Sequence, residues 1–369
     1  MIRSINDRTL ESYFKQKIST NEQNTQEGIK YSLKNFESFC HEREKDTLEG
    51  VINKLLELQP EPREEITSEV LQDWVTWSHK RNHSPGTIRR YFSAVTRYLN
   101  YRGIRITEDI KDGINFPHKI KEQRFPLRIE HIQEIFRVAS FRKIALYLAL
   151  LSSGMRIGEA VSIKKQNLEK VYSASGEMRI KINIPAKFTK TKTSRSVFIS
   201  KEAWNYIYNA YERLNDDDFV WSTNRNNRTT VFAEGAALRR YLEKTGLDYN
   251  YESTNRNKIS LHSFRAYFFT KAARVDVDFA QSMLGHTGYL NREYDRLTDD
   301  EKLEIYLKIE PELIISEEDR LKIKNQKLEI EKLDLEKRIP FLVNEAVERV
   351  RLDLINTGWK IKPLINSKF

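Results

Sequence analysis

The sequence predicts a mainly helical protein in which a helical N-terminal domain precedes an α+β second domain and a helical tail. Apolar residues recur at helical spacing over most of the chain. Only two neighbouring segments, residues 179–184 and 195–199, alternate as strands do, which predicts one small β-hairpin or sheet. A length of 369 residues, with 39% hydrophobic and 31% charged residues, is sufficient for two or three packed domains.

Residues 1–115 are expected to form the helical N-terminal domain. Apolar residues and the single cysteine, Cys40, fall on one face of a first helix that starts near residue 25, so we expect a buried thiol. The proline-bearing stretch 59–63 is expected to interrupt the helices, and Ser68 to cap the next one. Ser84 precedes a proline that suits the first position of a third helix. The outer face of this helix is cationic and carries Arg89, Arg90 and Arg97.

A basic stretch with prolines, residues 116–126, is expected to link this domain to the second one, residues 127–315. The second domain begins with helical patterns, and the segment 141–153 is almost wholly apolar and therefore buried. The turn between the two predicted strands, residues 185–194, contains three lysines and no acid. The other helices are expected over residues 129–138, 201–214 and 235–244, and from Ser263 onward.

Residues 316–369 are expected to form a highly charged helical tail. Leu321, Leu328 and Leu335 are spaced by seven, but the companion positions needed for a coiled-coil seam are poor. The tail is therefore expected either to reach a neighbouring protomer or to fold back on its own domain.

Composition narrows the class of function. The net charge of +10 favours a polyanionic partner, because neutralised phosphates release counterions. One cysteine excludes internal disulfides and zinc ribbons. No apolar stretch approaches 20 residues and the N-terminus lacks a signal-peptide core, so we expect a cytoplasmic protein with no membrane contact.

Four short motifs follow one another in a fixed order in the second domain. They are Gly154-Met-Arg-Ile-Gly-Glu159, Lys190 in the basic turn, His262-Ser-Phe-Arg265, and Leu284-Gly-His286 followed by Tyr294. Together they contain two guanidiniums, a lysine, two imidazoles and a phenol. Guanidinium forks match the oxygens of a phosphate, and a nucleophile with a proton donor completes phosphodiester exchange without a metal.

This ordered set resembles the catalytic motifs of the tyrosine recombinases, the phage and plasmid integrase family. The resemblance implies that Arg156 and Arg265 bind the scissile phosphate, and that Glu159 braces the site. It implies that Lys190 protonates the leaving 5′ oxygen and that Tyr294 is the nucleophile. The implied catalytic residues are Arg156, Lys190, His262, Arg265, His286 and Tyr294, with Glu159 in support.

Two of these assignments have alternatives. Lys192 could replace Lys190 as the proton donor, and Lys187 is a weaker candidate. Tyr289 lies only three residues after the last motif, too close to come from a separate helix, so we expect its side chain to have a packing role.

The segment around Tyr294 lacks the Ser/Thr-rich stretch of bacterial members and looks more like integrases of archaeal viruses and plasmids. Whether this tyrosine cleaves in its own subunit or a neighbour's stays open.

The resemblance implies a site-specific DNA recombinase of a mobile element, which cuts and rejoins strands through a 3′-phosphotyrosyl intermediate without metal, ATP or another cofactor. It implies double-stranded DNA as partner, association with the nucleoid, a homotetramer at synapsis, and accessory DNA-bending or directionality factors. The alternatives are a type IB topoisomerase-like enzyme and a non-enzymatic DNA-binding regulator derived from an integrase. A helical RNA-binding module would fit the charge but not the motifs. The chain has no GxxxxGK[ST] motif, which argues against an ATPase motor.

Overall fold

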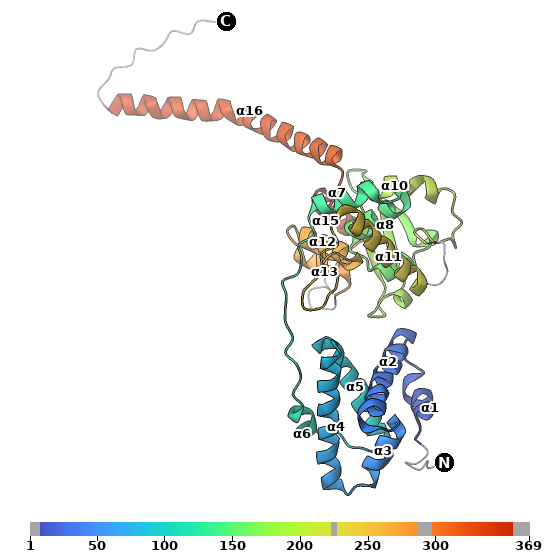
Figure 1. The fold of residues 1–369 in the computed structure, drawn as a ribbon. Coiled ribbons are helices and arrows are strands. Elements are labelled where there is room, and N and C mark those ends of the chain that lie inside the picture. Colours follow the sequence, from blue (N-terminus) through green and yellow to red (C-terminus); the bar gives the residue numbers. More distant parts are fainter. Residues whose placement is uncertain (1–7, 223–226, 287–296, 357–369) are drawn as a thin grey trace. The chain divides into compact units, whose positions relative to one another are not determined.

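A computed structural model describes residues 8–222, 227–286 and 297–356 (Figure 1). The chain divides into two compact units, Met1–Gln123 with Tyr251–Arg256, and Arg124–Asn250 with Asn257–Phe369. Each unit has its own apolar core. Helices predominate among the described residues, which also contain one three-stranded sheet, and this confirms the predicted fold class. None of the helices described is long and apolar enough to cross a membrane.

All helices and turns of regular structure described in the first unit are α- or π-helical, and no strand is described there. Its core contains stacked and edge-on aromatic side chains, with Phe36 and Trp74 at a ring-centroid distance of 4.9 Å. Cys40 is fully buried in this core, as expected. The elements are α1 (Leu10–Tyr13), the π-helical turns η2 (Phe14–Ile18) and η3 (Cys40–Glu44), α2 (Gln23–Phe39), α3 (Leu48–Glu57), α4 (Pro60–Lys80), α5 (Pro85–Arg102) and α6 (Glu108–Gly113).

The start of α4 corrects the sequence-based prediction. The helix begins at Pro60 with Gln59 as its N-cap, so the break between α3 and α4 is limited to residues 58–59 and residues 60–63 form the first turn of α4. Ser68 therefore lies inside the helix rather than at its cap. A proline at the first helical position costs nothing, because its missing N–H would have no intrahelical partner there. The prediction for α5 is confirmed, since the Ser84 hydroxyl accepts a hydrogen bond from the Thr87 N–H at 3.3 Å.

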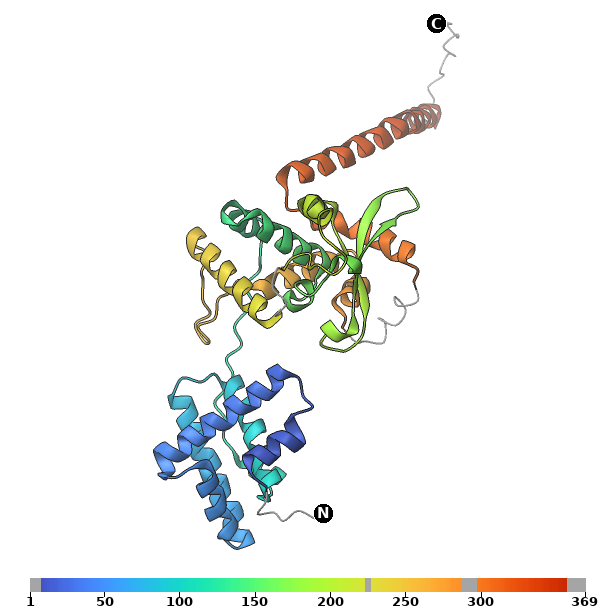
Figure 2. The same ribbon diagram turned by 90° about the vertical axis from the view of Figure 1, so that its right-hand side faces the viewer.

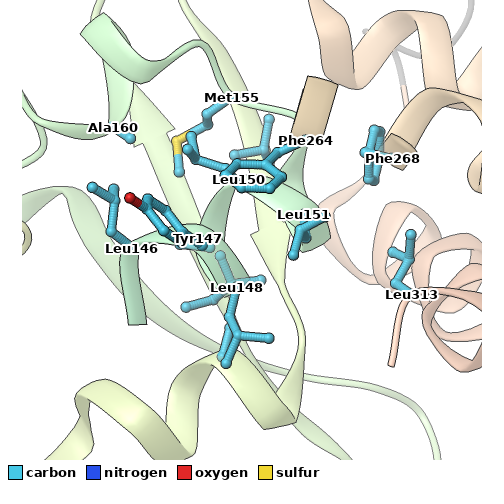
Figure 3. Packing of buried hydrophobic residues seen from close by; sticks show 14 of the residues in the cluster. Leu146, Tyr147, Leu148, Leu150, Leu151, Met155, Ala160, Phe264, Phe268 and Leu313 are labelled. Atoms are coloured by element: carbon cyan, nitrogen blue, oxygen red, sulfur yellow. The ribbon is translucent and has the colours of Figure 1, made fainter. Parts of the chain in front are cut away.

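The second unit surrounds a buried helix and a small sheet. Helices α7 (Ile129–Val138) and α8 (Phe141–Ser153) coincide with the predicted segments. Figure 3 shows side chains of α8 packed beside Phe264 and Phe268 of α12, and the rings of Tyr147 and Phe264 are 5.0 Å apart. The remaining elements are α9 (Ile157–Ala160), η4 (Lys165–Asn167), β1 (Leu168–Tyr172), β2 (Met178–Ile184), η5 (Ala186–Phe188), β3 (Arg195–Ile199), α10 (Lys201–Tyr211), α11 (Asn227–Thr245), α12 (Leu261–Ala272), α13 (Val277–Leu284), α15 (Asp299–Ile309), η6 (Glu310–Glu312) and α16 (Glu317–Asn356).

The sheet is antiparallel with strand order β1-β2-β3, and its arrows are visible in Figure 2. β2 and β3 form the predicted hairpin, and β1 is an additional strand that was not predicted. Alternate residues of β2 face opposite sides. Ile180 and Ile182 are buried in the apolar core, whereas Arg179 and Lys181 form ion pairs with η6 and the start of α15. The sheet is therefore covered on both faces.

The part of the tail that the structure describes, which ends at Asn356, is helical. α16 extends over 40 residues and contains Pro340. The three heptad-spaced leucines lie at exposed positions, with 53%, 51% and 55% of Leu321, Leu328 and Leu335 accessible to solvent.

Candidate active site

Arg156 stands at a sharp turn between two helices. α8 ends at Gly154, whose φ of +66° is in the left-handed region that glycine adopts without strain. A Cβ at this glycine would lie 2.5 Å from Cδ1 of Phe268, so the turn also needs glycine for space. Arg156 is then the N-cap of α9, and 31% of its side chain remains exposed. The turn thus presents a guanidinium at the surface of a rigid core.

Glu159 lies directly beneath this arginine and is almost completely buried, with 1% of its side chain exposed. Its Oε1 accepts a hydrogen bond from Nη1 of Arg156 at 2.9 Å, and its Oε2 accepts one from the Arg156 backbone N–H at 2.8 Å. Burial alone would raise the pKa of Glu159, but the hydrogen bonds and charge of Arg195, together with the hydrogen bonds from Arg156, hold it below its ordinary value. The carboxylate is therefore ionised at neutral pH.

Arg265 is buried on α12 and joins two of the motifs. Its Nη1 donates to the Gly154 carbonyl and its Nη2 to the Leu284 carbonyl, both at 2.6 Å. Each of these nitrogens carries a second N–H, so donors remain for an anion. Burial and then the charge of Arg156 lower the pKa of Arg265 to about 9, which still leaves it protonated at pH 7. The side chain is a buried cation that is hydrogen-bonded to carbonyl oxygens.

The two imidazoles are exposed beside these guanidiniums. His262 lies one turn before Arg265 on α12, and His286 follows the left-handed Gly285 at the end of α13, where φ is +66°. Partial burial, and then the positive charge of Arg265 and Arg156, lower the pKa of both histidines. Since the ordinary value is about 6.5, both are neutral at pH 7.

Lys190 lies in the turn between β2 and β3 and is exposed, as are Lys187 and Lys192. The turn is held by Thr189, whose Oγ1 lies 2.9 Å from the carbonyl oxygens of Ala186 and Thr193. Within residues 8–222, 227–286 and 297–356, Lys190 forms no hydrogen bond or ion pair. The choice among the three lysines therefore stays a prediction.

Arg195, predicted only as the start of a strand, belongs to the same cluster. Its Nη2 and Nη1 donate to Oε2 and Oε1 of Glu159 at 2.6 and 3.2 Å. Its Nε donates to the Met283 carbonyl at 2.9 Å. The strand pattern contained a signal for this, since Arg195 shares the parity of the buried Val197 and Ile199. A cation in an inward-facing row needs an anionic partner.

The charges of the cluster do not balance. Among residues 8–222, 227–286 and 297–356, Glu159 is the one carboxylate that pairs with Arg156 and Arg195, and Arg265 donates to carbonyl oxygens instead. Three cations beside two neutral imidazoles and one anion form a site for a further anion, and forked guanidiniums match phosphate oxygens. Among the described residues, no group of three or more His, Cys, Asp and Glu side chains is arranged to hold a metal ion. Tyr289 and Tyr294 lie outside the described residues.

Comparison with a family model gives a match over the same region. Residues 126–290 match the model of the phage integrase family. A curated relative, tyrosine recombinase XerC of Rickettsia massiliae (strain Mtu5), is 31% identical over 116 residues, and the match covers 27% of this chain and 37% of that protein. The chain thus spans about a third of the length of the curated relative it matches.

Two solved structures share the fold. A lambda integrase (residues 75–356) dimer bound to a COC′ core site matches with a TM-score of 0.53 and 15% identity, covering 79% of this chain and 97% of that one. The Tn1549 transposon integrase in complex with circular intermediate DNA matches with a TM-score of 0.50 and 11% identity, covering 83% and 99%. At these identities the likeness extends to the fold alone.

Proposed function

We propose that this chain, whose residues 126–290 match the phage integrase family, is a site-specific tyrosine recombinase or integrase that cuts and rejoins DNA strands. The observation that carries the proposal is that, in the described part of the chain, Arg156, Arg195 and Arg265 are gathered near the one carboxylate of Glu159. This excess of positive charge is what a phosphodiester requires when it gains charge in a pentacoordinate transition state.

In the proposed reaction, Tyr294 attacks the scissile phosphorus and the bond from phosphorus to the 5′ oxygen breaks. The products are a 3′-phosphotyrosyl bond and a 5′ hydroxyl, to which Lys190 supplies the proton. Arg156 and Arg265 stabilise the phosphate oxygens, and the neutral imidazole of His262 or His286 accepts the proton that the Tyr294 phenol loses on attack. Attack by the 5′ hydroxyl of another strand reverses the step, so neither ATP nor a metal is needed.

The finer features of the proposal follow the same reasoning. Double-stranded DNA is the substrate, and the cationic face formed by Arg89, Arg90 and Arg97, all exposed on α5, suits its backbone.

Four protomers would join two duplexes at synapsis, with accessory bending or directionality factors. We place the protein in the cytoplasm at the nucleoid, as the product of a mobile element similar to those of archaeal viruses and plasmids. The exposed apolar side chains of α16 are consistent with a tail that reaches a neighbouring protomer.

A covalent-adduct experiment tests the function and the nucleophile together. The substrate is a nicked duplex whose binding site has been selected from a random library with the full chain. In EDTA, the wild type should form an adduct that survives denaturing electrophoresis. The adduct should disappear in Tyr294→Phe and persist in Tyr289→Phe, since only a phenol held in line can form the ester. Both variants keep the ring, so each serves as the other's packing control.

The other outcomes separate the alternatives. An adduct that persists in Tyr294→Phe and disappears in Tyr289→Phe would move the nucleophile to Tyr289. No adduct on a bound duplex would favour the DNA-binding regulator. An enzyme that relaxes supercoiled DNA without forming recombinant products would favour the topoisomerase-like alternative.

A further inference from the structure

Arg195 uses every nitrogen of its guanidinium to join two separate parts of the second unit. It is the first residue of β3 and only 8% of its side chain is exposed. Two of its nitrogens hold the two oxygens of Glu159, and the third holds the carbonyl of Met283, the penultimate residue of α13. Because a bidentate guanidinium–carboxylate pair is planar and directional, this contact fixes the orientation of the carboxylate.

The orientation and charge of the Glu159 carboxylate in turn determine where the Arg156 guanidinium lies and how much of its charge is neutralised. Glu159 accepts hydrogen bonds from the side chain and backbone of Arg156, so the carboxylate that Arg195 holds also positions the exposed guanidinium. Arg195, Glu159 and Arg156 together carry one net positive charge. Without Arg195, the buried carboxylate would be left to Arg156 alone, and the pair would carry no net charge toward a phosphate.

The Met283 carbonyl, to which Arg195 donates, lies shortly before His286 in the chain. The stem of Arg195 passes close to Gly285, where a Cβ would be 3.0 Å from the arginine Cδ. This glycine ends α13 and immediately precedes His286. Arg195 therefore supports the backbone from which the imidazole projects, in addition to the carboxylate beneath Arg156.

We propose that Arg195 is a positioning residue that sets Arg156, through Glu159, and His286, through the end of α13, around one phosphate. The proposal rests on the function proposed above. It assigns Arg195 a role through Glu159 and the end of α13, and no contact with DNA.

Arg179 provides a matched control. It lies on the neighbouring strand β2, 9% of its side chain is exposed, and it holds the buried Glu310 through Nε and Nη2. Glu310 lies in η6, away from the four motifs in the sequence. Arg179→Gln thus breaks a buried arginine–glutamate pair of the same kind without touching Glu159.

The experiment compares Arg195→Gln, Arg195→Lys and Arg179→Gln in the full chain. The single-turnover rate of adduct formation is measured at saturating nicked duplex, with the duplex Kd and the urea midpoint measured in parallel. Both glutamine variants should lower the urea midpoint comparably. Arg195→Gln should slow adduct formation about a hundredfold with less than a threefold change in Kd, since a misplaced catalytic group costs about that factor. Arg179→Gln should stay within about threefold of the wild type.

Arg195→Lys should form the adduct at less than a tenth of the wild-type rate, since one ammonium cannot hold both carboxylate oxygens and the Met283 carbonyl. The double variant Arg195→Gln/Glu159→Gln should be no slower than its slower single variant if Arg195 acts through Glu159. Adduct formation by Arg195→Gln at the rate of Arg179→Gln, or additive losses in the double variant, would overturn the proposal. If the wild type forms no adduct on a duplex that it binds, the proposed function itself would be refuted.

Discussion

Replacing Gly154 by alanine is a quantitative test of the turn that presents Arg156. The residue has φ +66°, and the added Cβ would lie 2.5 Å from Cδ1 of Phe268 and 2.7 Å from Cδ2 of Leu284. The left-handed conformation costs an alanine roughly 1–2 kcal/mol. Overpacking against two buried side chains adds about 1–3 kcal/mol. We therefore expect Gly154→Ala to lower the free energy of unfolding by about 2–5 kcal/mol.

Gly246 offers an almost ideal control for this substitution. It follows α11 in the same unit with φ +67°, and nothing lies within 4 Å of the Cβ position. Gly246→Ala should therefore cost only the conformational term, roughly 1–2 kcal/mol. Each substitution restricts the unfolded chain equally, so the difference between the two variants isolates the packing cost.

Urea unfolding followed by circular dichroism measures both variants. Since the two glycines belong to one compact unit, both report on the same transition even if the two units unfold separately. Equal losses of stability in Gly154→Ala and Gly246→Ala would refute the packing argument. The clash also bears on the site, because the Gly154 carbonyl accepts a hydrogen bond from Arg265. Adduct formation should consequently fall at least tenfold in Gly154→Ala and stay within about threefold in Gly246→Ala.

Two further predictions concern protons. Lys190→Ala should lose cleavage of an ordinary duplex and recover it on a 5′-phosphorothiolate duplex, whose leaving group needs no proton; failure to recover, with recovery in Lys192→Ala, would move the role to Lys192. Arg156→Gln should raise the pKa of His262 and His286 toward about 6.5, because it removes one of the positive charges that lower them. An NMR pH titration of the imidazoles in the free protein measures this, and unchanged or lower pKa values would contradict the assigned electrostatics.

Elements with a strong local pattern could be predicted from the sequence. α7 and α8 begin and end at the predicted residues, because helical periodicity and the glycine after α8 mark them. The prediction for the start of α4 was wrong because two prolines were interpreted as a break, whereas Pro60 occupies the position where a helix tolerates it. β1 was missed because it is only five residues long and buries just Leu168 and Val171. Its place depends on pairing with β2, a tertiary effect.

The assembly of the site is a different problem, since its main contacts involve backbone atoms. Arg265 bridges the first and last motifs by donating to the carbonyls of Gly154 and Leu284, and Arg195 donates to that of Met283. Every residue has a backbone carbonyl, so the identity of a residue does not show whether its carbonyl accepts one of these hydrogen bonds. The motif arginines could be found by their spacing, but the acceptors that hold Arg265 in place could not.

Arg195 combines both kinds of contact. Its pairing with Glu159 could have been predicted from the sequence, whereas its hydrogen bond to the Met283 carbonyl could not. The strand parity that buries Val197 and Ile199 also turns Arg195 inward, and a buried guanidinium requires an anion. Glu159 is the acid of the first motif, so balancing the charges of the motifs could have paired the two from residue identity alone. The catalytic lysine offers no comparable argument. Lys187, Lys190 and Lys192 are all exposed in one turn, and only a bound phosphodiester would distinguish them.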